Sequence, residues 1–180
     1  RTAHLARNDG LTGLPNRASF LEWLTRQTGE SSGHAKVALL AIDLDRFKEV
    51  NDIHGHAAGD QLLVRVAERM KAALHPGEFV ARLGGAEFVA LAPVSQREEA
   101  RGLAGRLCQA TIPRVHLEHA EVPCGASVGI AVWPDDAAEI SALINDADLA
   151  MYRAKASLTT DVCFYEEAMD EAVRNRRRMV

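Results

Sequence analysis

The sequence FVARLGGAEFVALAP, residues Phe79 to Pro93, contains two apolar segments separated by Gly84 and Gly85. Both glycines adopt positive φ without steric cost, and a Gly-Gly pair between two apolar segments is a β-hairpin signal. We therefore expect a hairpin whose tip is formed by residues 84 and 85. A tight turn needs these glycines whether or not a ligand lies against the backbone, so the pair alone does not identify a site.

Helices and strands are expected on both sides of this hairpin. The segment Lys36–Asp43 is a short apolar run that ends in an acid, and its length favours a buried strand over a helix. An α+β fold is predicted from the order of elements, rather than a doubly wound parallel sheet. The other expected helices are 16–27, 45–52, 61–74, 97–110, 140–156 and a charged segment to the end, and the other expected strands are 114–122, 126–132 and 161–165.

The composition is that of an ordinary soluble globular domain. The chain has 180 residues, of which 47% are hydrophobic, and this is long enough for one domain with a full core. A net charge of −4 argues against a general nucleic-acid binder. No apolar run approaches the ~18 residues needed to cross a bilayer. The three cysteines form no CxxC pair, so buried free thiols in a cytoplasmic protein are expected.

Carboxylates follow the first predicted strand in the segment AIDLDRFKEVND. Asp43 and Asp45 are two residues apart, so their side chains point the same way if the strand persists. Carboxylates held there can bind Mg²⁺, which is usually shared with substrate phosphates, and Lys48 is close enough in sequence to meet those phosphates. Asp45 is also a candidate cap for the following helix, and we favour that interpretation. Asp43 is the better metal candidate, because capping does not explain it.

Six segments of the chain resemble blocks of the GGDEF family and occur in the family's order. Together they cover nearly the whole chain from Asp9 onward. The resemblance implies a domain over residues 9–165 with a central, mostly antiparallel sheet flanked by helices, similar to the nucleotidyl cyclase and ferredoxin-like palm. The six segments are DGLTGLPNR (9–17), DLDRFKEVND (43–52), GHAAGD (55–60), RLGGAEF (82–88), SVGIAV (127–132) and ADLAMYRAK (147–155).

Members of the GGDEF family join two GTP molecules into cyclic di-GMP. Each domain of a homodimer holds one GTP, so that a 3′-hydroxyl attacks the α-phosphate of the other. The resemblance implies that Asp43 and the Leu44 carbonyl bind Mg²⁺ or Mn²⁺, and that Asp43 and Glu87 are catalytic. The substrate-binding residues that it implies are Phe47, Lys48, Asn51, Asp60, Gly84, Gly85 and Lys155.

Asn51 and Asp60 are the residues that the resemblance assigns to the guanine base. Guanine offers two N–H donors on one edge, and a carboxylate can accept both, whereas adenine offers a different pattern. The assignment of Asp60 therefore agrees with the chemistry of the base. Local capping of the neighbouring helices is the other interpretation of these two residues.

The family signature is changed at one position of the hairpin. It runs glycine, glycine, an acid, glutamate, phenylalanine, but Ala86 stands here in place of the acid. In the family this residue gives a carboxylate to the metals, and a methyl group coordinates nothing. Losing even an outer-shell partner of a metal ligand costs ~10–100-fold in affinity or activity, so weak or absent cyclase activity is expected. Glu87 is poorly placed to substitute, since adjacent strand residues face opposite sides of a sheet.

Two further differences from the family pattern affect other contacts. The residues Leu158, Thr159 and Thr160 stand where members usually have glycine, arginine and asparagine, so one phosphate-facing arginine is missing. The family's product-inhibition site is an arginine and an aspartate three residues apart, shortly before the hairpin. His75 and Glu78 occupy those positions, so no inhibitory site is expected.

Both ends of the chain resemble connections to other domains. Residues 1–8 resemble the end of an incoming signalling helix, and residues 166–180 are expected to form a helix leading towards an EAL phosphodiesterase domain. A domain that holds GTP without converting it can bias the conformation of such a neighbour. A degenerate GTP-binding and Mg²⁺-binding regulatory module is therefore the preferred hypothesis. An active diguanylate cyclase and a nucleotide-free dimerisation domain are the alternatives.

Overall fold

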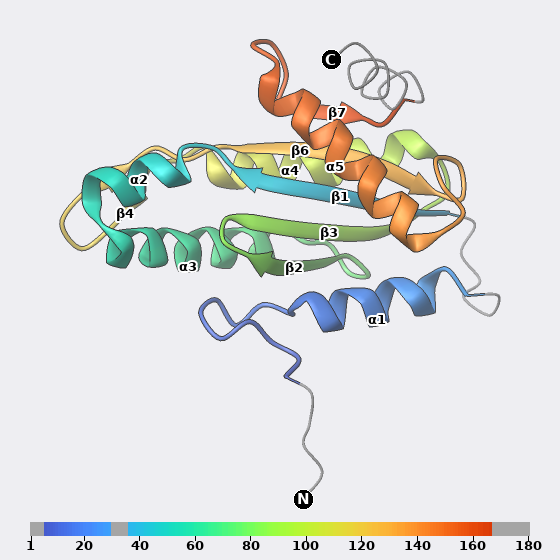
Figure 1. The fold of residues 1–180 in the computed structure, drawn as a ribbon, viewed down its shortest axis with the longest axis horizontal. Coiled ribbons are helices and arrows are strands. Elements are labelled where there is room, and N and C mark those ends of the chain that lie inside the picture. Colours follow the sequence, from blue (N-terminus) through green and yellow to red (C-terminus); the bar gives the residue numbers. More distant parts are fainter. Residues whose placement is uncertain (1–5, 30–35, 167–180) are drawn as a thin grey trace, which may run out of the picture.

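The computed structural model describes residues 6–29 and 36–166 of the chain (Figure 1). The segments 1–5 and 167–180, on which most of the expected incoming helix and C-terminal connecting helix fall, lie outside the described residues. The elements, in chain order, are α1 (Arg17–Gln27), β1 (Lys36–Leu44), α2 (Phe47–His54), α3 (His56–Ala72), β2 (Phe79–Gly84), β3 (Glu87–Val94), the 3₁₀-helix η1 (Arg97–Glu99), α4 (Ala100–Thr111), β4 (Val115–His116), β5 (Glu121–Val122), β6 (Ala126–Trp133), α5 (Ile140–Ala156) and β7 (Val162–Phe164).

Five strands form the main sheet, in the order β2-β3-β1-β6-β7. The pairs β2–β3, β3–β1 and β1–β6 are antiparallel, and only the pair β6–β7 is parallel. The expected α+β fold with a mostly antiparallel central sheet is therefore confirmed. Strand β1 lies in the middle, and every residue from Val37 to Ile42 is buried, which explains why its sequence is an almost continuous apolar run.

Helices cover both faces of the sheet (Figure 1). The sheet thus divides the hydrophobic core in two. On one face, Leu40 and Ile42 of β1 pack with the apolar sides of α3 and α4. On the other face, Leu39 and Ala41 pack with α1 and α5. Alternate residues of β1 thus serve the two cores, as the two-residue period of a strand requires. This alternation decides which side chains reach the candidate site.

The hairpin between β2 and β3 forms where the glycine pair predicts it, with a one-residue shift of its tip. Gly84 pairs with Glu87, so the turn consists of Gly85 and Ala86 rather than residues 84 and 85. Gly84 has φ 148° and Gly85 has φ 49°, values that side chains other than glycine rarely adopt. The two glycines therefore satisfy a backbone requirement of the turn.

Two predicted elements differ from the structure. Helix α3 begins at His56, five residues before the predicted start. The reason is that Gly55, with φ 89°, is both the C-cap of α2 and the N-cap of α3. The segment 114–122, expected as one strand, forms the two short strands β4 and β5, which pair with each other. The Leu117 N–H donates to the Ala120 carbonyl at 2.7 Å and closes the turn between them. No helix among the described residues is long and apolar enough to cross a membrane.

Candidate functional site

The acids at the end of β1 and at the hairpin meet on one face of the sheet. Asp43 is the direct partner of Glu87 in the β1–β3 register. Their neighbours Ile42 and Phe88 belong to the core beneath α3 and α4, so both carboxylates face the α1 and α5 side. Cross-strand partners have Cβ atoms about 5 Å apart, close enough for two carboxylates to share one cation.

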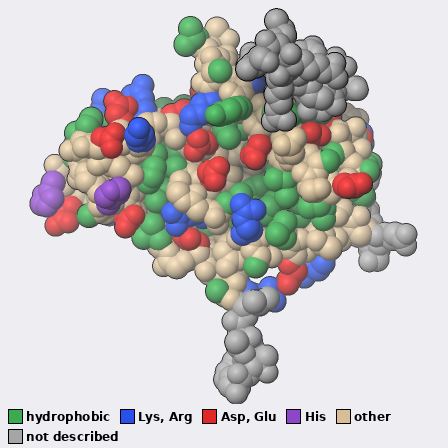
Figure 2. All heavy atoms as spheres, in the orientation of Figure 1, with side chains coloured by type: hydrophobic (Ala, Val, Ile, Leu, Met, Phe, Trp, Pro, Cys, Tyr) green, Lys and Arg blue, Asp and Glu red, His purple; other side chains and the backbone are tan. Residues whose placement is uncertain are grey.

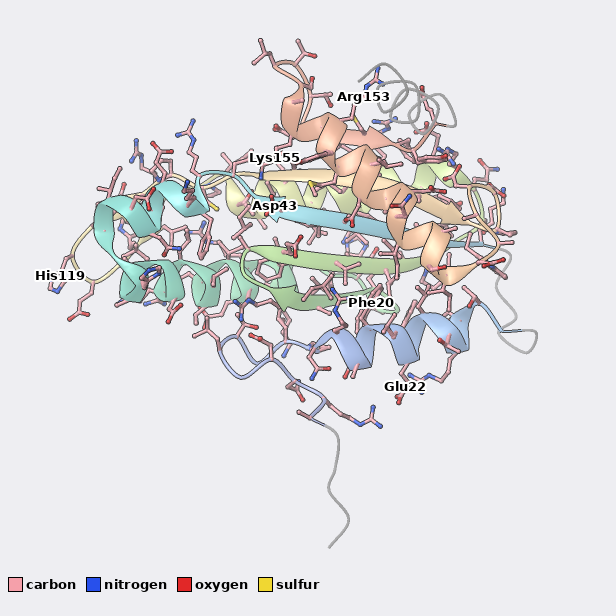
Figure 3. All side chains as sticks on the ribbon, in the orientation of Figure 1. Phe20, Glu22, Asp43, His119, Arg153 and Lys155 are labelled. Atoms are coloured by element: carbon pink, nitrogen blue, oxygen red, sulfur yellow. The ribbon has the colours of Figure 1, made fainter. Side chains whose placement is uncertain are left out.

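Lys155 reaches this position from the C-terminal end of α5, as Figure 3 shows. Its ammonium group contacts Oδ2 of Asp43, and the two side chains are 38% and 23% exposed. The residues are 112 positions apart in the chain, so only the packing of α5 on β6 and β1 brings them together. An acid and a base predicted to serve a metal and a phosphate therefore lie side by side.

Ala86 lies at the turn beside these residues. Its carbonyl accepts a hydrogen bond of 3.2 Å from the Leu44 N–H, and its side chain packs against the core beneath α3 and α4. Ala86 and Glu87 thus face opposite sides, as strand alternation predicts. Glu87 is nevertheless on the same face as Asp43, which the sequence argument did not consider. Among the described residues, no three acid, histidine or cysteine side chains converge in a way that could hold a metal ion.

The bend between β1 and α2 differs from the predicted helix cap. The Asp45 carboxylate caps no helix, because its Oδ1 accepts a hydrogen bond of 2.9 Å from the Ser127 hydroxyl. The N-cap residue of α2 is Arg46, with φ 66°, and within residues 36–166 no side chain caps this helix end. The first N–H groups of α2, with Phe47 and Lys48 in its first turn, are therefore available to an anion.

Asn51 of α2 and Asp60 of α3 are brought together where the two helices pack. A Cβ atom at Gly59 would lie 1.8 Å from Oδ1 of Asn51, so this contact admits only glycine. Within the described part of the chain, this buried Oδ1 has no hydrogen-bond partner. Capping does not explain either residue, because Gly55 forms the junction of the two helices. Asp60 is exposed, whereas Oδ1 of Asn51 is buried against Gly59.

A partly buried ion pair orients the hairpin tip. Arg82 Nη1 donates to both carboxylate oxygens of Asp9, at 2.9 and 3.0 Å, and the two side chains are 13% and 16% exposed. Arg82 Nε also donates to the Gly85 carbonyl at 3.0 Å. Burial raises the pKa of Asp9, but hydrogen bonds from Thr12 and Arg82 outweigh it and hold that pKa below its ordinary value. Sequence reasoning did not assign this role, because the two residues are 73 positions apart.

The residues at the expected positions of the product-inhibition site have other partners. Arg106 of α4 binds Glu78 with two hydrogen bonds of 2.7 Å each. The His75 N–H donates to the same carboxylate at 2.6 Å. Burial raises the pKa of Glu78, and the stronger effect of Arg106 and the His75 N–H lowers it below its ordinary value. The Glu78 carboxylate is thus already neutralised within the domain.

A further acid, Asp148 of α5, lies near Glu87 and was not singled out from the sequence. Its side chain is exposed, but partial desolvation and then the negative charge of Glu87 raise its pKa, while Arg17 opposes the rise. Asp148, Glu87 and Arg17 line a small hollow of about 60 Å³ against β1 and β3. Figure 2 shows acidic and basic side chains around hydrophobic ones on this face, which carries α1 and α5.

Comparisons with known proteins agree with this arrangement. Residues 6–160 match the family described as "Diguanylate cyclase, GGDEF domain". The chain is 44% identical over 156 residues to the diguanylate cyclase TpbB of Pseudomonas aeruginosa. The matched region covers 85% of this chain and 36% of TpbB. The chain is 37% identical over 177 residues to the bifunctional diguanylate cyclase/cyclic di-GMP phosphodiesterase MucR of the same organism, covering 98% of this chain and 26% of MucR.

A solved structure shows the same fold. The GGDEF domain of TpbB from Pseudomonas aeruginosa superimposes with a TM-score of 0.86 at 38% identity, over 93% of this chain and 99% of that one. The chain spans about a third or less of the length of the two curated relatives. The matched residues nevertheless include β1, the hairpin and α5, which carry the candidate site. The chain therefore belongs to the GGDEF diguanylate cyclase family.

Proposed function

We propose that this domain binds GTP together with Mg²⁺ or Mn²⁺ and regulates an attached domain, with weak or absent cyclase activity. The observation that carries the proposal is the methyl group of Ala86 at the hairpin turn, where the family has a metal-binding acid. Asp43, Lys48, Glu87 and Lys155 remain, although the phosphate-facing arginine expected near Thr159 is also missing. Loss of a metal donor with these groups retained favours binding over turnover.

The oxygen atoms around Asp43 fit a hard divalent cation. Asp43 and Glu87 are partners in register on one face, and the Leu44 carbonyl follows directly in the chain. Mg²⁺ and Mn²⁺ prefer carboxylate and carbonyl oxygens, and Mg²⁺ shares such ligands with substrate phosphates. A bound cation would draw negative charge away from the triphosphate. With Ala86 the protein offers one carboxylate fewer for that task.

Positive groups and free N–H groups favour the phosphates at the same end of the sheet. The N-terminus of α2 lacks a side-chain cap, and Lys48 lies in its first turn. Lys155 lies beside Asp43, within reach of the same ligand. Gly84 and Gly85 leave the hairpin without side chains where a nucleotide would approach, and Phe47 offers an apolar contact. We assign these groups to the triphosphate and the sugar.

Guanine selectivity is assigned to Asn51 and Asp60. The Asn51 side chain packs against Gly59, the chain neighbour of Asp60, so its amide lies at the same junction of α2 and α3. Asp60 is exposed on the neighbouring helix and provides two acceptor oxygens. A base with two adjacent N–H donors satisfies these acceptors, and guanine has such an edge.

A slow diguanylate cyclase is the second candidate function. It is favoured by the register of Glu87 with Asp43, because Glu87 or a water molecule beside it could provide the oxygen that Ala86 lacks. The substrate would still need a second domain, so a homodimer is part of this candidate. We expect such turnover to be slow, since the family places its metal-binding acid at position 86 and not at position 87.

Regulation of a neighbouring EAL domain is proposed from the C-terminal end and from the relative MucR. The chain leaves the sheet at Tyr165, whose carbonyl accepts a hydrogen bond of 2.5 Å from Arg97. Arg97 also pairs with Asp136, and this anchors the exit point to the loop after β6. A conformational bias at the nucleotide site has a short route through β6 to this exit. We further propose that cyclic di-GMP does not act through Glu78, because Arg106 already neutralises it.

Calorimetric titration tests the proposal. GTP with Mn²⁺ is titrated into the domain, ATP with Mn²⁺ serves as the control for base selectivity, and the reaction mixture is then assayed for cyclic di-GMP by mass spectrometry. We expect heat with GTP, much less heat with ATP, and little product. Rapid accumulation of product would favour the cyclase. Absence of heat at millimolar GTP would favour a nucleotide-free dimerisation domain over both.

A further inference from the structure

The Asp45 side chain is fixed by strand β6 and not by the helix that follows it. Its Oδ1 accepts a 2.9 Å hydrogen bond from the hydroxyl of Ser127, a polar side chain that is only 2% exposed. Its backbone N–H donates to the Gly125 carbonyl at 2.9 Å. Two hydrogen bonds to residues 125 and 127 therefore define where the chain turns after β1. Ser127 is 82 residues further along the chain than Asp45.

The segment before β6 is shaped to receive this carboxylate. Gly125 has φ 128°, and a Cβ atom there would lie 3.2 Å from Oδ2 of Asp45. A side chain at position 125 would thus be strained by its backbone and pressed against the carboxylate. The close approach of Asp45 to β6 depends on a glycine at this position.

The turn itself is one that an arginine rarely adopts. Arg46 has φ 66° and ψ 8°, in the left-handed region, and it is the sole residue other than glycine with positive φ in the described part of the chain. Such a conformation persists only where the surroundings hold it. On one side the Leu44 N–H is bound by the Ala86 carbonyl, and on the other side Asp45 is bound by Ser127 and Gly125.

We propose that Asp45 is a positioning residue of the nucleotide site. Its hydrogen bond to Ser127 holds the left-handed turn at Arg46, and this turn aims the Leu44 carbonyl and the first N–H groups of α2. The identity of the ligand rests on the proposed function. Asp45 acts through the backbone, because its carboxylate is bound by the Ser127 hydroxyl and its N–H by the Gly125 carbonyl.

The asparagine variant separates the two roles. Asp45→Asn keeps an oxygen that accepts from Ser127 but removes the negative charge, whereas Asp45→Ala and Ser127→Ala each remove the hydrogen bond. Asp52→Ala, an exposed acid of α2, is the matched control for loss of charge near the site. Each variant is measured by calorimetry with GTP and Mn²⁺ and by the backbone amide resonances of residues 46–48, with a thermal unfolding curve to verify the fold.

We expect Asp45→Ala and Ser127→Ala to shift those resonances and to weaken GTP binding about 10–100-fold, the usual effect of removing an outer-shell partner. Asp45→Asn and Asp52→Ala should remain near the unmodified protein in both measurements. Equal losses in Asp45→Asn and Asp45→Ala would overturn the proposal in favour of a direct role for the charge. Unchanged resonances and affinity in Ser127→Ala would also overturn it, and this variant decides the matter if Asp45→Ala does not fold.

A failure of the proposed function can be distinguished from a failure of the proposed role of Asp45. If the unmodified protein binds no GTP with Mn²⁺, the assignment of the nucleotide is wrong. The amide resonances of residues 46–48, measured without ligand, then test the role of Asp45 in the turn. Unshifted resonances in Asp45→Ala and Ser127→Ala would reject that role, and shifts in both with none in Asp45→Asn would support it.

Discussion

Asp43 of β1 and Glu87 of β3 are direct partners in the antiparallel register, and both face the side of the sheet covered by α1 and α5. Ala86, one residue before Glu87, packs towards the opposite core. Strand alternation therefore separates the two acids from Ala86. The proposed cation site rests on Asp43 and Glu87, which share one face.

Asp60 is predicted to set the preference for guanine. Asp60→Asn replaces one acceptor oxygen by an N–H donor, which would face a donor of the base. Hydrogen bonds to charged groups contribute about 1.5–3 kcal/mol, so we expect GTP affinity to fall about 10–100-fold while ATP affinity changes little. Calorimetric titrations of both nucleotides measure this. Glu68→Gln on the exposed side of α3 is the control, and an equal loss in that variant would reject the assignment.

Arg82 is predicted to be the main anchor of the hairpin tip. Arg82→Met leaves the partly buried Asp9 carboxylate without its cation and without charge-assisted hydrogen bonds, and we expect this to lower the free energy of unfolding by about 1.5–3 kcal/mol. Chemical denaturation at pH 7 measures this value. Arg65→Met, which alters an exposed pair on α3, should change it little.

The contribution of this pair depends on pH in a defined direction. The fold lowers the pKa of Asp9, so its stabilisation is present above the ordinary aspartate pKa and is lost as the pH falls through the lowered value. The difference between the unmodified protein and Arg82→Met should shrink below about pH 4. A difference that stays constant down to pH 2 would contradict this account of Asp9.

Asp148 is predicted to have the opposite dependence on pH. The fold raises its pKa, by burial and then by the charge of Glu87, so the stability that it adds is present below its ordinary pKa and is lost as the pH rises through the raised value. Asp148→Asn should therefore increase the thermal midpoint at pH 7 and have little effect at pH 3. Asp52→Asn, on an exposed part of α2, is the control. A decrease at pH 7 would show that Asp148 is stabilising when ionised.

Much of the fold could be predicted because its signals are local. The glycine pair predicted the hairpin, and the short apolar run predicted β1. The predicted start of α3 was wrong, because the composition of GHAAGD is typical of a loop. In the structure Gly59 of this segment lies within α3 and packs against Asn51. The favoured capping role of Asp45 was also wrong, since its partner Ser127 is 82 residues away.

Asp43 and Lys48 were predicted from their position after the first strand, and the rest of the candidate site was predicted from the family blocks. Lys155 and Asp43 are in contact although 112 positions separate them, and no periodicity connects them. The Asp9–Arg82 pair joins two recognised blocks, yet neither block indicates its partner. The Glu87–Asp43 register follows from the strand order, which the sequence does not specify. Sequence reasoning could not predict contacts between residues that only the sheet topology brings together.

The central claim is that the methyl group of Ala86 limits catalysis. Ala86→Asp restores a carboxylate at the turn, and we compare its rate of cyclic di-GMP formation from GTP and Mg²⁺ with that of the unmodified protein, by mass spectrometry at equal protein concentration. We predict a rise of at least about 10–100-fold, the range for a lost metal partner. Equal rates in the two proteins, whether both fast or both absent, would contradict the claim.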